Sequence, residues 1–542
     1  MEKWLSRLDL NTLRKLAGEV VLQAIEDKVK SNLEGELSKV LLYKYGYSIL
    51  EQKNIRLAII DSFSQVESER LAAKLGIRYE GKSLIWLITE IQKKFKSFTY
   101  NKSLILCDFL GLSEDYHKQN NVDERPSSVS ITVKHNEEAR LKSYLHPYQK
   151  GVKDQALSRL ITNSSDSFMV QMPTGSGKTY TAQEVMVDVL RSPNFNKFVV
   201  WIVNSNELAE QAFESFQHLW KIKGDKEILL HRMFGKFEPK FTPNNYGAVF
   251  IGFDKLNSIL TNYEHKHYEE TKFLIENTEL VIVDEAHKSV AETYNNCIEA
   301  FNTYKSKLIG LTATPGRGSV DETLELVDLF SGDIVQIIDE NNHPISDPIS
   351  FLQKEEYLAE IDVELFKTDV AVKESTEGSI LETLSKNPSR NSKIIDLIRQ
   401  ANENKESTLV FACSLDHVIA LKILCDHENI PVEFIIGSVN QAERLNILQR
   451  FKDKEFFILI NLDILSTGID VPNVNKLIIT RPVGSSILYS QIVGRALRGV
   501  KNGGNHRNTI INLKDNLLNY SDINSLFGKF ELEWQGKINY SS

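Results

Sequence analysis

Short runs of β-branched and aromatic residues alternate with helical patterns from about residue 145 onward. This alternation predicts α/β units, in which parallel strands form a sheet and helices cover both of its faces. The first series of runs predicts strands at residues 167–170, 198–203, 248–252, 280–283 and 307–311. Ligands of open α/β sheets bind beyond the carboxyl ends of the strands, so we expect functional residues in the loops that follow these runs.

A second series of apolar runs follows a polar stretch at residues 368–392. It predicts strands at 408–413, 432–436, 456–460, 476–480 and 508–513. The fold class is therefore α/β, with two tandem parallel-sheet domains that we place at residues 144–367 and 368–542.

Residues 1–143 follow a helical pattern instead. Apolar positions at helical spacing predict helices within 67–77 and 84–95, and a polar linker follows at 117–128. We expect residues 1–143 to form a separate, mostly helical accessory domain.

Composition narrows the class of protein. Lysine and arginine number 64 against 73 aspartate and glutamate, a net charge of -9, so any nucleic-acid binding would have to use a local cleft. The four cysteines are scattered, which favours buried thiols over a metal cluster. The sequence opens without the apolar run of a signal peptide, and no apolar run is long enough to span a bilayer, which indicates a cytoplasmic protein.

The loop after the run at 167–170 is a phosphate-binding candidate with the sequence PTGSGKT. Glycines at 175 and 177 let backbone N–H groups close around phosphate oxygens at a helix N-terminus. Lys178 can reach the β- and γ-phosphates, and the Thr179 hydroxyl can ligate Mg²⁺. Met172 replaces the first glycine of the usual pattern. The predicted nucleotide ligands are Thr174, Gly175, Ser176, Gly177, Lys178 and Thr179.

An acidic pair, Asp284 and Glu285, follows the run at 280–283 within the sequence DEAH. Asp284 is the expected Mg²⁺ ligand, and Glu285 is the expected residue that orients and deprotonates the attacking water. Together with the phosphate-binding loop, this pair predicts ATP hydrolysis.

The sequence QIVGRALR at 491–498 supplies a third element, from the second α/β domain. Helical spacing would place Gln491, Arg495 and Arg498 on one face of a helix. Two arginines that face a γ-phosphate across an interdomain cleft can stabilise transition-state charge, which makes hydrolysis depend on domain closure. Gly494 within a helix indicates close packing at that point.

These elements, in this order, resemble the superfamily 2 helicases of the DEAH type, with two RecA-like domains, and in particular the motor subunits of type I and type III restriction enzymes. The resemblance covers about 145–515. It implies that Gln149 of LHPYQ contacts adenine and that Gly468 and Asp470 of GIDVP face the nucleotide. It also implies that His287, Thr312 and Thr314 couple the ATP site to the nucleic-acid groove.

The expected nucleic-acid contacts depart from the pattern of RNA-directed DEAD-box proteins. Asn204–Ala209 replaces PTRELA, which keeps a hydroxyl at Ser205 and loses a cation at Asn206. Backbone N–H groups can still bind phosphate there. The sparse side-chain contacts favour DNA over RNA as the track. The candidate contacts are Ser205, Gly252, Ser414, Gly437 and Ser438.

Several functions stay open. The first is an ATP-driven DNA helicase or translocase in repair, restriction or anti-phage defence. The second is a duplex-tracking translocase, or an ATPase sensor subunit that binds a nuclease or other defence partner through its N-terminal domain. A nuclease site built from Asp61, Glu80 and Lys82 would need a β-hairpin where the sequence predicts a helix. A nucleic-acid-binding scaffold with a decayed ATPase is disfavoured, because all the catalytic residue types are present.

Overall fold

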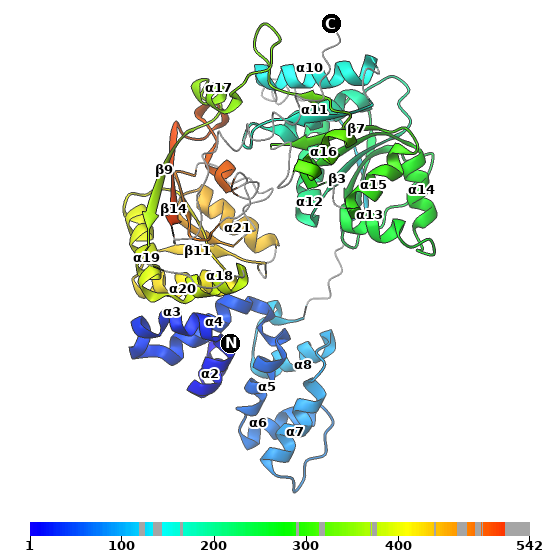
Figure 1. Cartoon of the computed structure of the whole chain (residues 1–542). Helices are drawn as coiled ribbons and strands as arrows, with labels where there is room; N and C mark the ends of the chain where they lie inside the picture. The colour runs from blue at the N-terminus through cyan, green and yellow to red at the C-terminus, as the bar shows by residue number, and fades with distance from the viewer. Residues whose placement is uncertain are drawn as a thin grey trace.

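A computed structural model of the chain describes residues 1–118, 125–133, 144–162, 166–288, 292–313, 320–368, 370, 377–437, 439, 441–462, 474–482, 489 and 492–514. The described residues form a helical N-terminal region and two α/β units (Figure 1). A helical N-terminal region lies against the second α/β unit, and that unit in turn faces the first.

The first sheet contains eight strands among the described residues, in the order β1-β4-β5-β3-β6-β7-β2-β8. Every pairing is parallel except that of β1 with β4. The strands are β1 (Ser128–Ile131), β2 (Ser167–Gln171), β3 (Phe198–Val203), β4 (Ile228–Met233), β5 (Gly247–Gly252), β6 (Thr278–Asp284), β7 (Lys307–Thr312) and β8 (Ile334–Val335). The helices are α10 (Pro147–Thr162), α11 (Lys178–Leu190), α12 (Asn206–Lys223), α13 (Phe253–Leu260), α14 (Tyr268–Glu276), α15 (Glu292–Asn302) and α16 (Val320–Leu329).

The central strand β3 illustrates how the sequence builds this sheet. All of its residues are buried, and they alternate between two apolar cores. Val199 and Trp201 pack in the core that includes α11 and α12, whereas Val200 and Ile202 pack in the core that includes α13 and α15. A continuous apolar run is therefore a strand that helices cover on both faces.

The second sheet has the order β11-β12-β10-β13-β14-β9 among the described residues, with parallel pairings throughout. Its strands are β9 (Glu360–Lys367), β10 (Thr408–Phe411), β11 (Val432–Ile435), β12 (Ile458–Asn461), β13 (Lys476–Ile479) and β14 (Arg507–Lys514). Its helices are α17 (Pro348–Lys354), α18 (Glu377–Lys386), α19 (Pro388–Glu403), α20 (Leu415–His427) and α21 (Gln441–Lys452). The predicted α/β fold with two parallel sheets is confirmed.

The strand β9 differs from the sequence-based division of the chain. The sequence places the second domain after residue 367, but β9 pairs with β14 along its whole length. The chain therefore enters the second sheet at Glu360. The hydrophobic pattern of the sequence does not predict this strand. The reason is that β9 is an edge strand, which exposes Val363 and Leu365 and carries acidic residues between its apolar ones.

The N-terminal region is helical, as predicted. Its helices are α1 (Glu2–Leu5), α2 (Leu10–Ala17), α3 (Glu19–Val29), α4 (Leu33–Tyr45), α5 (Lys53–Asp61), α6 (Gln65–Lys74), α7 (Leu84–Phe95) and α8 (Tyr100–Leu110). Side chains of Ser64, Ser83 and Thr99 cap the N-termini of α6, α7 and α8. Helix α6 lies between Asp61 and Glu80, and residues 1–118 contain no strand, so the β-hairpin of a nuclease site is absent from this described segment.

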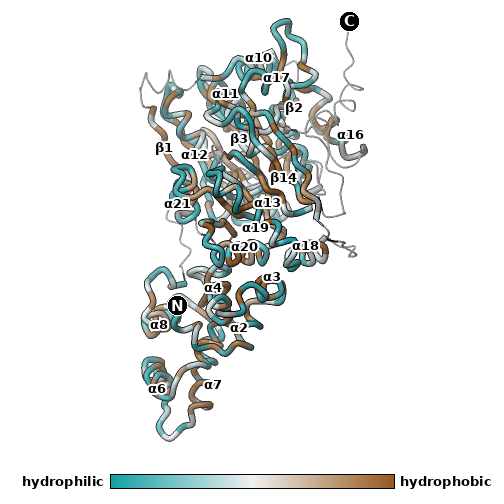
Figure 2. The backbone as a smooth tube through the Cα atoms, turned by 90° about the vertical axis from the view of Figure 1, so that its left-hand side faces the viewer, coloured by the Kyte–Doolittle hydropathy of each residue, from teal (hydrophilic) through white to brown (hydrophobic). Residues whose placement is uncertain are grey.

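Helix α20 joins the N-terminal region to the second sheet. It is apolar around most of its circumference, with Val418, Ile419, Leu421 and Leu424 all buried, because the sheet lies on one side and α3 and α4 lie on the other (Figure 2). The Tyr43 hydroxyl donates a 2.8 Å hydrogen bond to Asp426. One hydrophobic core thus runs from the N-terminal helices into the second sheet. None of the helices in the described part of the chain has both the length and the apolar composition that a bilayer crossing requires.

Candidate active site

The phosphate-binding loop connects the carboxyl end of β2 to α11. Gly175 and Gly177 have φ values of 83° and 82°, in the left-handed region where glycine is favoured. The buried Ser176 closes the loop, since its hydroxyl donates a 2.6 Å hydrogen bond to the Pro173 carbonyl. Met172, the departure from the usual pattern, is fully buried in the apolar core. The substitution at Met172 therefore leaves intact the glycine conformations that the phosphate-binding pattern predicts.

Gln149 lies in α10 directly behind this loop. Its Nε2 donates to the Ser176 carbonyl at 2.9 Å, and its Oε1 accepts from the His146 backbone N–H at 2.9 Å. A Cβ at Gly177 would lie 2.3 Å from Gln149 Nε2, so glycine is required for this approach. A glutamine amide has two donor hydrogens and two acceptor lone pairs, so one of each is still available. That pair matches the N6 donor and N7 acceptor of adenine.

The acidic pair lies at the carboxyl end of β6. Glu285 has a φ of 52°, in the left-handed region. This backbone conformation costs about 1–2 kcal/mol for a residue other than glycine. The Glu285 backbone N–H donates a 3.0 Å hydrogen bond to Asp284 Oδ1. Strain of this kind is concentrated at functional sites, where the surrounding structure holds a side chain in a required direction.

His287 bridges the acidic pair and the neighbouring strand. Its Nδ1 is 3.3 Å from Glu285 Oε2 and 3.3 Å from Thr312 Oγ1, at the end of β7. Both His287 and Thr312 are buried. A shift of Thr312 would therefore reach Glu285 through a single side chain, as the predicted coupling role requires. Thr314, the other predicted coupling residue, lies outside the described residues.

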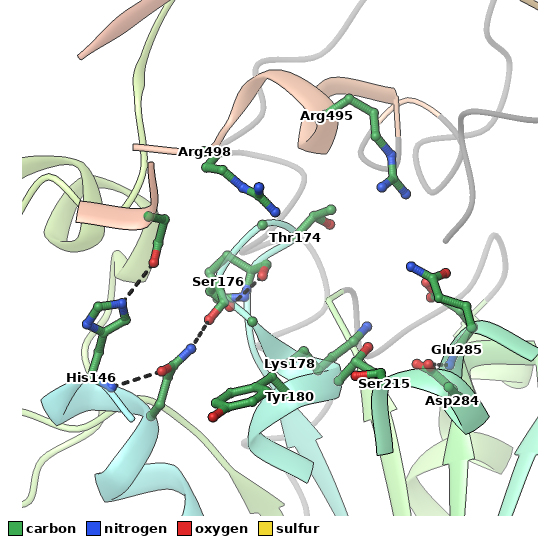
Figure 3. Close-up of a pocket in the computed structure, with 18 of the residues that line it drawn as sticks. His146, Thr174, Ser176, Lys178, Tyr180, Ser215, Asp284, Glu285, Arg495 and Arg498 are labelled. Atoms are coloured by element: carbon green, nitrogen blue, oxygen red, sulfur yellow. Dashed lines mark hydrogen bonds between the residues drawn. The ribbon is translucent and has the colours of Figure 1, made fainter. Parts of the chain in front are cut away.

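The two predicted arginines come from the second α/β unit and point toward the phosphate-binding loop (Figure 3). The expectation of one continuous helix is wrong at Arg498. A short 3₁₀-helix spans Gly494–Ala496, and Arg498 then forms an antiparallel bridge with Leu358. Helical spacing therefore does not explain why Arg495 and Arg498 converge. Pairing with the segment that leads into β9 sets the direction of Arg498.

The predicted close packing at Gly494 occurs across the interface between the two units. A Cβ at Gly494 would lie 2.0 Å from Cγ2 and 2.8 Å from Cβ of Thr174. A Cβ at Gly175 would similarly lie 3.3 Å from Cβ of Leu497. Two glycines thus let residues 494–498, which we call the arginine segment, lie directly on the phosphate-binding loop.

These elements enclose one cavity of about 570 Å³. It brings together the predicted residues Gln149, Thr174, Gly175, Ser176, Gly177, Lys178, Thr179, Asp284, Glu285, Arg495 and Arg498. Thr179 and Asp284 supply oxygen ligands of the kind that Mg²⁺ prefers, so this donor set fits the ion. Gly468, Asp470 and Gln491 lie outside the described residues.

The residues of this cavity that the sequence did not single out include Tyr144, His146, Tyr180 and Asn502. His146 and Tyr148 stack with ring centroids 5.9 Å apart. The spacing of Tyr144, His146 and Tyr148 was an available signal for this aromatic cluster. No local pattern connects Asn502 with it.

A second cavity, of about 520 Å³, lies at the carboxyl ends of β3 and β5 and includes Ser205 and Gly252. Ser205 caps α12 by accepting a 3.2 Å hydrogen bond from the Leu208 N–H, and Gly252 immediately precedes α13. Two helix N-termini therefore open toward this cavity, an arrangement that suits phosphate groups. Asn206 does not replace the cationic phosphate contact of the DEAD-box pattern. Its Oδ1 instead accepts a 3.0 Å hydrogen bond from the Gly235 N–H.

The second sheet carries the other nucleic-acid candidates. Ser414 caps α20 by accepting from the His417 N–H at 3.1 Å, and its hydroxyl is 3.0 Å from that of Ser385. Gly437 is exposed beyond β11. Strand β12 lies between β10 and β11, which separates these two positions by about 10 Å. Ser438 lies outside the described residues.

Two family models match parts of this chain. The family described as Type III restriction enzyme, res subunit, matches residues 142–317. The Helicase conserved C-terminal domain matches residues 389–500. The Saccharomyces cerevisiae protein IRC3, named as an ATP-dependent helicase, is 25% identical over 65% of this chain and 49% of its own length. A type I restriction enzyme EcoKI endonuclease subunit of Escherichia coli is 22% identical over 64% of this chain and 32% of its own.

The chain spans about half the length of IRC3. The solved structure of the ATP-dependent Type ISP restriction-modification enzyme LlaBIII bound to DNA is 16% identical, with a TM-score of 0.49 over 73% of this chain and 30% of that one. Helicase domains hydrolyse ATP and bind nucleic acid. The chain belongs to the superfamily 2 helicases and resembles the motor subunits of restriction enzymes.

Proposed function

We propose that this protein is an ATP-driven DNA helicase or translocase whose ATP site lies between its two sheets. One observation carries the proposal: a single cavity contains the phosphate-binding loop and acidic pair of the first sheet and both arginines of the second. Because neither sheet contains the whole set, hydrolysis requires both sheets to be in contact. Repeated closing and opening is the physical basis of movement along a strand.

Each residue has a defined task in this proposal. Lys178 and the backbone N–H groups of the loop hold the phosphates, and Thr179 and Asp284 hold Mg²⁺. When bound, Mg²⁺ neutralises charge on the phosphate oxygens. Glu285 orients and deprotonates the attacking water, and Arg495 and Arg498 stabilise charge in the transition state.

DNA is the proposed track. The cavity at Ser205 and Gly252 offers helix N-termini, which bind a phosphate backbone and not particular bases. Glu207 and Asp254 also line it, so binding there depends on backbone N–H groups more than on net positive charge. Relatives named as restriction and DNA repair proteins support DNA, although two relatives are named as RNA helicases.

The decisive measurement is steady-state ATP hydrolysis with no nucleic acid, single-stranded DNA, duplex DNA or RNA. We expect DNA to stimulate turnover, and Lys178→Ala to abolish it. Absence of turnover with every nucleic acid would refute the motor function. Stimulation by RNA alone would refute the choice of DNA.

Strand separation is tested on forked and blunt duplexes, with displacement of a triplex-forming oligonucleotide as the readout for translocation. Displacement of the triplex without separation of the duplex would identify a translocase that tracks duplex DNA. ATP turnover without duplex separation and without triplex displacement would support the alternative role, an ATPase sensor subunit in a defence complex.

The N-terminal helices are the proposed site for a protein partner. Helices α3 and α4 are already packed on α20, whereas α7 leaves Ile85 80% exposed and Trp86 36% exposed at the far end of the molecule (Figure 1). A restriction-type or defence-type nuclease subunit would bind there. Loss of such a subunit's co-purification after Ile85→Asp, with ATP turnover unchanged, would support this site. Retention would exclude it.

A further inference from the structure

A hydrogen bond between the side chains of His146 and Asn502 connects the proposed base-binding side of the ATP cavity to the arginine segment. The His146 Nε2 is 2.8 Å from the Asn502 Oδ1. His146 precedes α10 of the first unit, and Asn502 ends a short 3₁₀-helix, Val500–Asn502, four residues after Arg498. Both residues line the cavity. The contact therefore crosses the interface on which hydrolysis depends.

His146, on the side of the first unit, is held by hydrogen bonds that lead to the phosphate-binding loop. The His146 backbone N–H donates to Gln149 Oε1, and Gln149 Nε2 donates to the Ser176 carbonyl of the phosphate-binding loop. The Tyr148 hydroxyl donates to the same carbonyl at 2.8 Å. His146 is thus placed by the residue that faces adenine and is one hydrogen bond from it.

Asn502 is anchored on the arginine side. Its Nδ2 donates to the Tyr357 carbonyl at 2.7 Å, and the Gly499 N–H donates to that carbonyl at 3.1 Å. The adjacent backbone is held by the bridge between Leu358 and Arg498. The two side-chain groups of Asn502 therefore have different partners, one in each unit, and its movement is tied to that of Arg498.

Aromatic contacts support the same connection. The Tyr357 ring centroid lies 4.6 Å from that of His146 and 4.9 Å from that of Tyr148. The Lys501 ammonium lies 4.6 Å from the Tyr357 ring centroid. Burial raises the pKa of Tyr148, and the nearby Asn502 side chain opposes that rise. The side chains between the base pocket and the arginine segment are therefore packed against each other.

We propose that the His146–Asn502 contact, which we call the interface strut, positions Arg498 according to whether the base pocket holds adenine. This inference rests on the proposed ATPase. His146 and Asn502 are positioning residues, since they act through Gln149 and Arg498. A base that hydrogen-bonds to Gln149 holds the Gln149 side chain in place, and with it the position of His146. His146 in turn holds Asn502 and the arginine segment in place. A base that cannot hydrogen-bond to Gln149 leaves Arg498 less well positioned. Both kcat and the affinity for the nucleotide then fall.

The test compares kcat and KM for ATP and GTP in the full-length protein and in Asn502→Ala. GTP is a suitable probe because guanine presents two acceptors where adenine presents a donor and an acceptor. In the wild type we expect kcat to favour ATP about fivefold, the factor that one neutral hydrogen bond supplies. In Asn502→Ala we expect kcat for ATP to fall about fivefold to the GTP value, while the KM preference for ATP remains.

His146→Gln provides the conservative variant, because a glutamine amide can still donate toward Asn502, and it should retain the preference in kcat. Asn196→Ala, an exposed asparagine in the loop before β3, is the matched control and should behave as the wild type. Equal loss of kcat for ATP and GTP in Asn502→Ala would overturn the proposal, because a merely structural defect predicts that result. Wild-type turnover that Lys178→Ala does not abolish would instead refute the proposed function, so the two failures are distinguishable.

Discussion

Substitution of Gly494 by alanine tests whether contact between the two units is the arrangement that hydrolyses ATP. The new Cβ would lie 2.0 Å from Cγ2 of Thr174, so the arginine segment and the phosphate-binding loop must separate by about 1.5 Å to reach ordinary contact. Gly494 has no left-handed backbone conformation, so alanine is compatible with its own unit. The clash is relieved by opening of the interface and does not require unfolding.

A misplacement of about 1 Å at a reacting centre can cost about 100-fold in rate. We therefore expect Gly494→Ala to lower single-turnover hydrolysis by about 100-fold or more, whereas binding of a fluorescent ATP analogue and the unfolding midpoint change little. Thr174→Ala removes the 2.0 Å contact and leaves the 2.8 Å contact, so the double variant should regain part of the activity.

Gly378→Ala is the matched control, because a Cβ at Gly378 meets no atom within 4 Å. Wild-type hydrolysis by Gly494→Ala would refute the reasoning, since it would mean that the closed contact is unnecessary. Loss of ATP binding in proportion to hydrolysis would also contradict it.

Arg498→Ala is expected to lower kcat by about 1000-fold with little loss of ATP affinity, as for other arginine fingers; equal losses in single-turnover hydrolysis and equilibrium binding would contradict a transition-state role. Burial lowers the pKa of His231 to about 4 from 6.5. As the pH falls, the unfolded chain therefore takes up this proton first, and stability should drop between pH 6.5 and pH 4 by up to about 3 kcal/mol. Urea unfolding at pH 7 and pH 5 measures this loss, which His231→Gln should largely remove; the same pH slope in both proteins would refute the assignment. Deletion of residues 1–118 should cause aggregation in size-exclusion chromatography, because it uncovers the outer face of α20. A monomeric product with a cooperatively unfolding second sheet would show that the shared core is dispensable.

The parts of the fold that sequence predicts are those that local patterns determine. The run at 198–203 is observed as β3 with the same limits, because six consecutive apolar residues between turns fit a strand that is buried on both faces. The phosphate-binding loop is equally local, since glycine conformations and the helix N-terminus follow from seven consecutive residues. Strand β4 escaped prediction because His231 and Arg232 interrupt its apolar pattern. Both are buried through tertiary partners: Arg232 pairs with Glu210 at 2.9 Å, and His231 is 2.8 Å from the Ser128 hydroxyl.

The contacts between units could not be predicted in this way. Gly494 could be read as a point of close packing, but its partner Thr174 lies more than 300 residues earlier in the chain. The spacing of Arg498 predicts a helix, and pairing with Leu358 overrides that preference. The hydrogen bond of Asn502 with His146 has no local signature, since an asparagine beside two glycines is also typical of a surface turn.

The backbone contacts around Arg498 limit how the interface can open. The Ala359 N–H donates to the Leu497 carbonyl at 2.8 Å, and the Lys501 N–H donates to the Glu356 carbonyl at 3.1 Å. These bonds attach the arginine segment to the stretch of chain that leads directly into β9, so both must move with the second sheet. The contacts of His146 with Asn502 and with the Tyr357 ring are made by side chains, so side-chain rotation can break them without a change in the backbone pairing. Opening should therefore separate the units at the interface strut while Arg498 stays fixed in its own unit. Under the proposed mechanism, the break would therefore lie between His146, next to the base pocket, and Arg498, next to the phosphates.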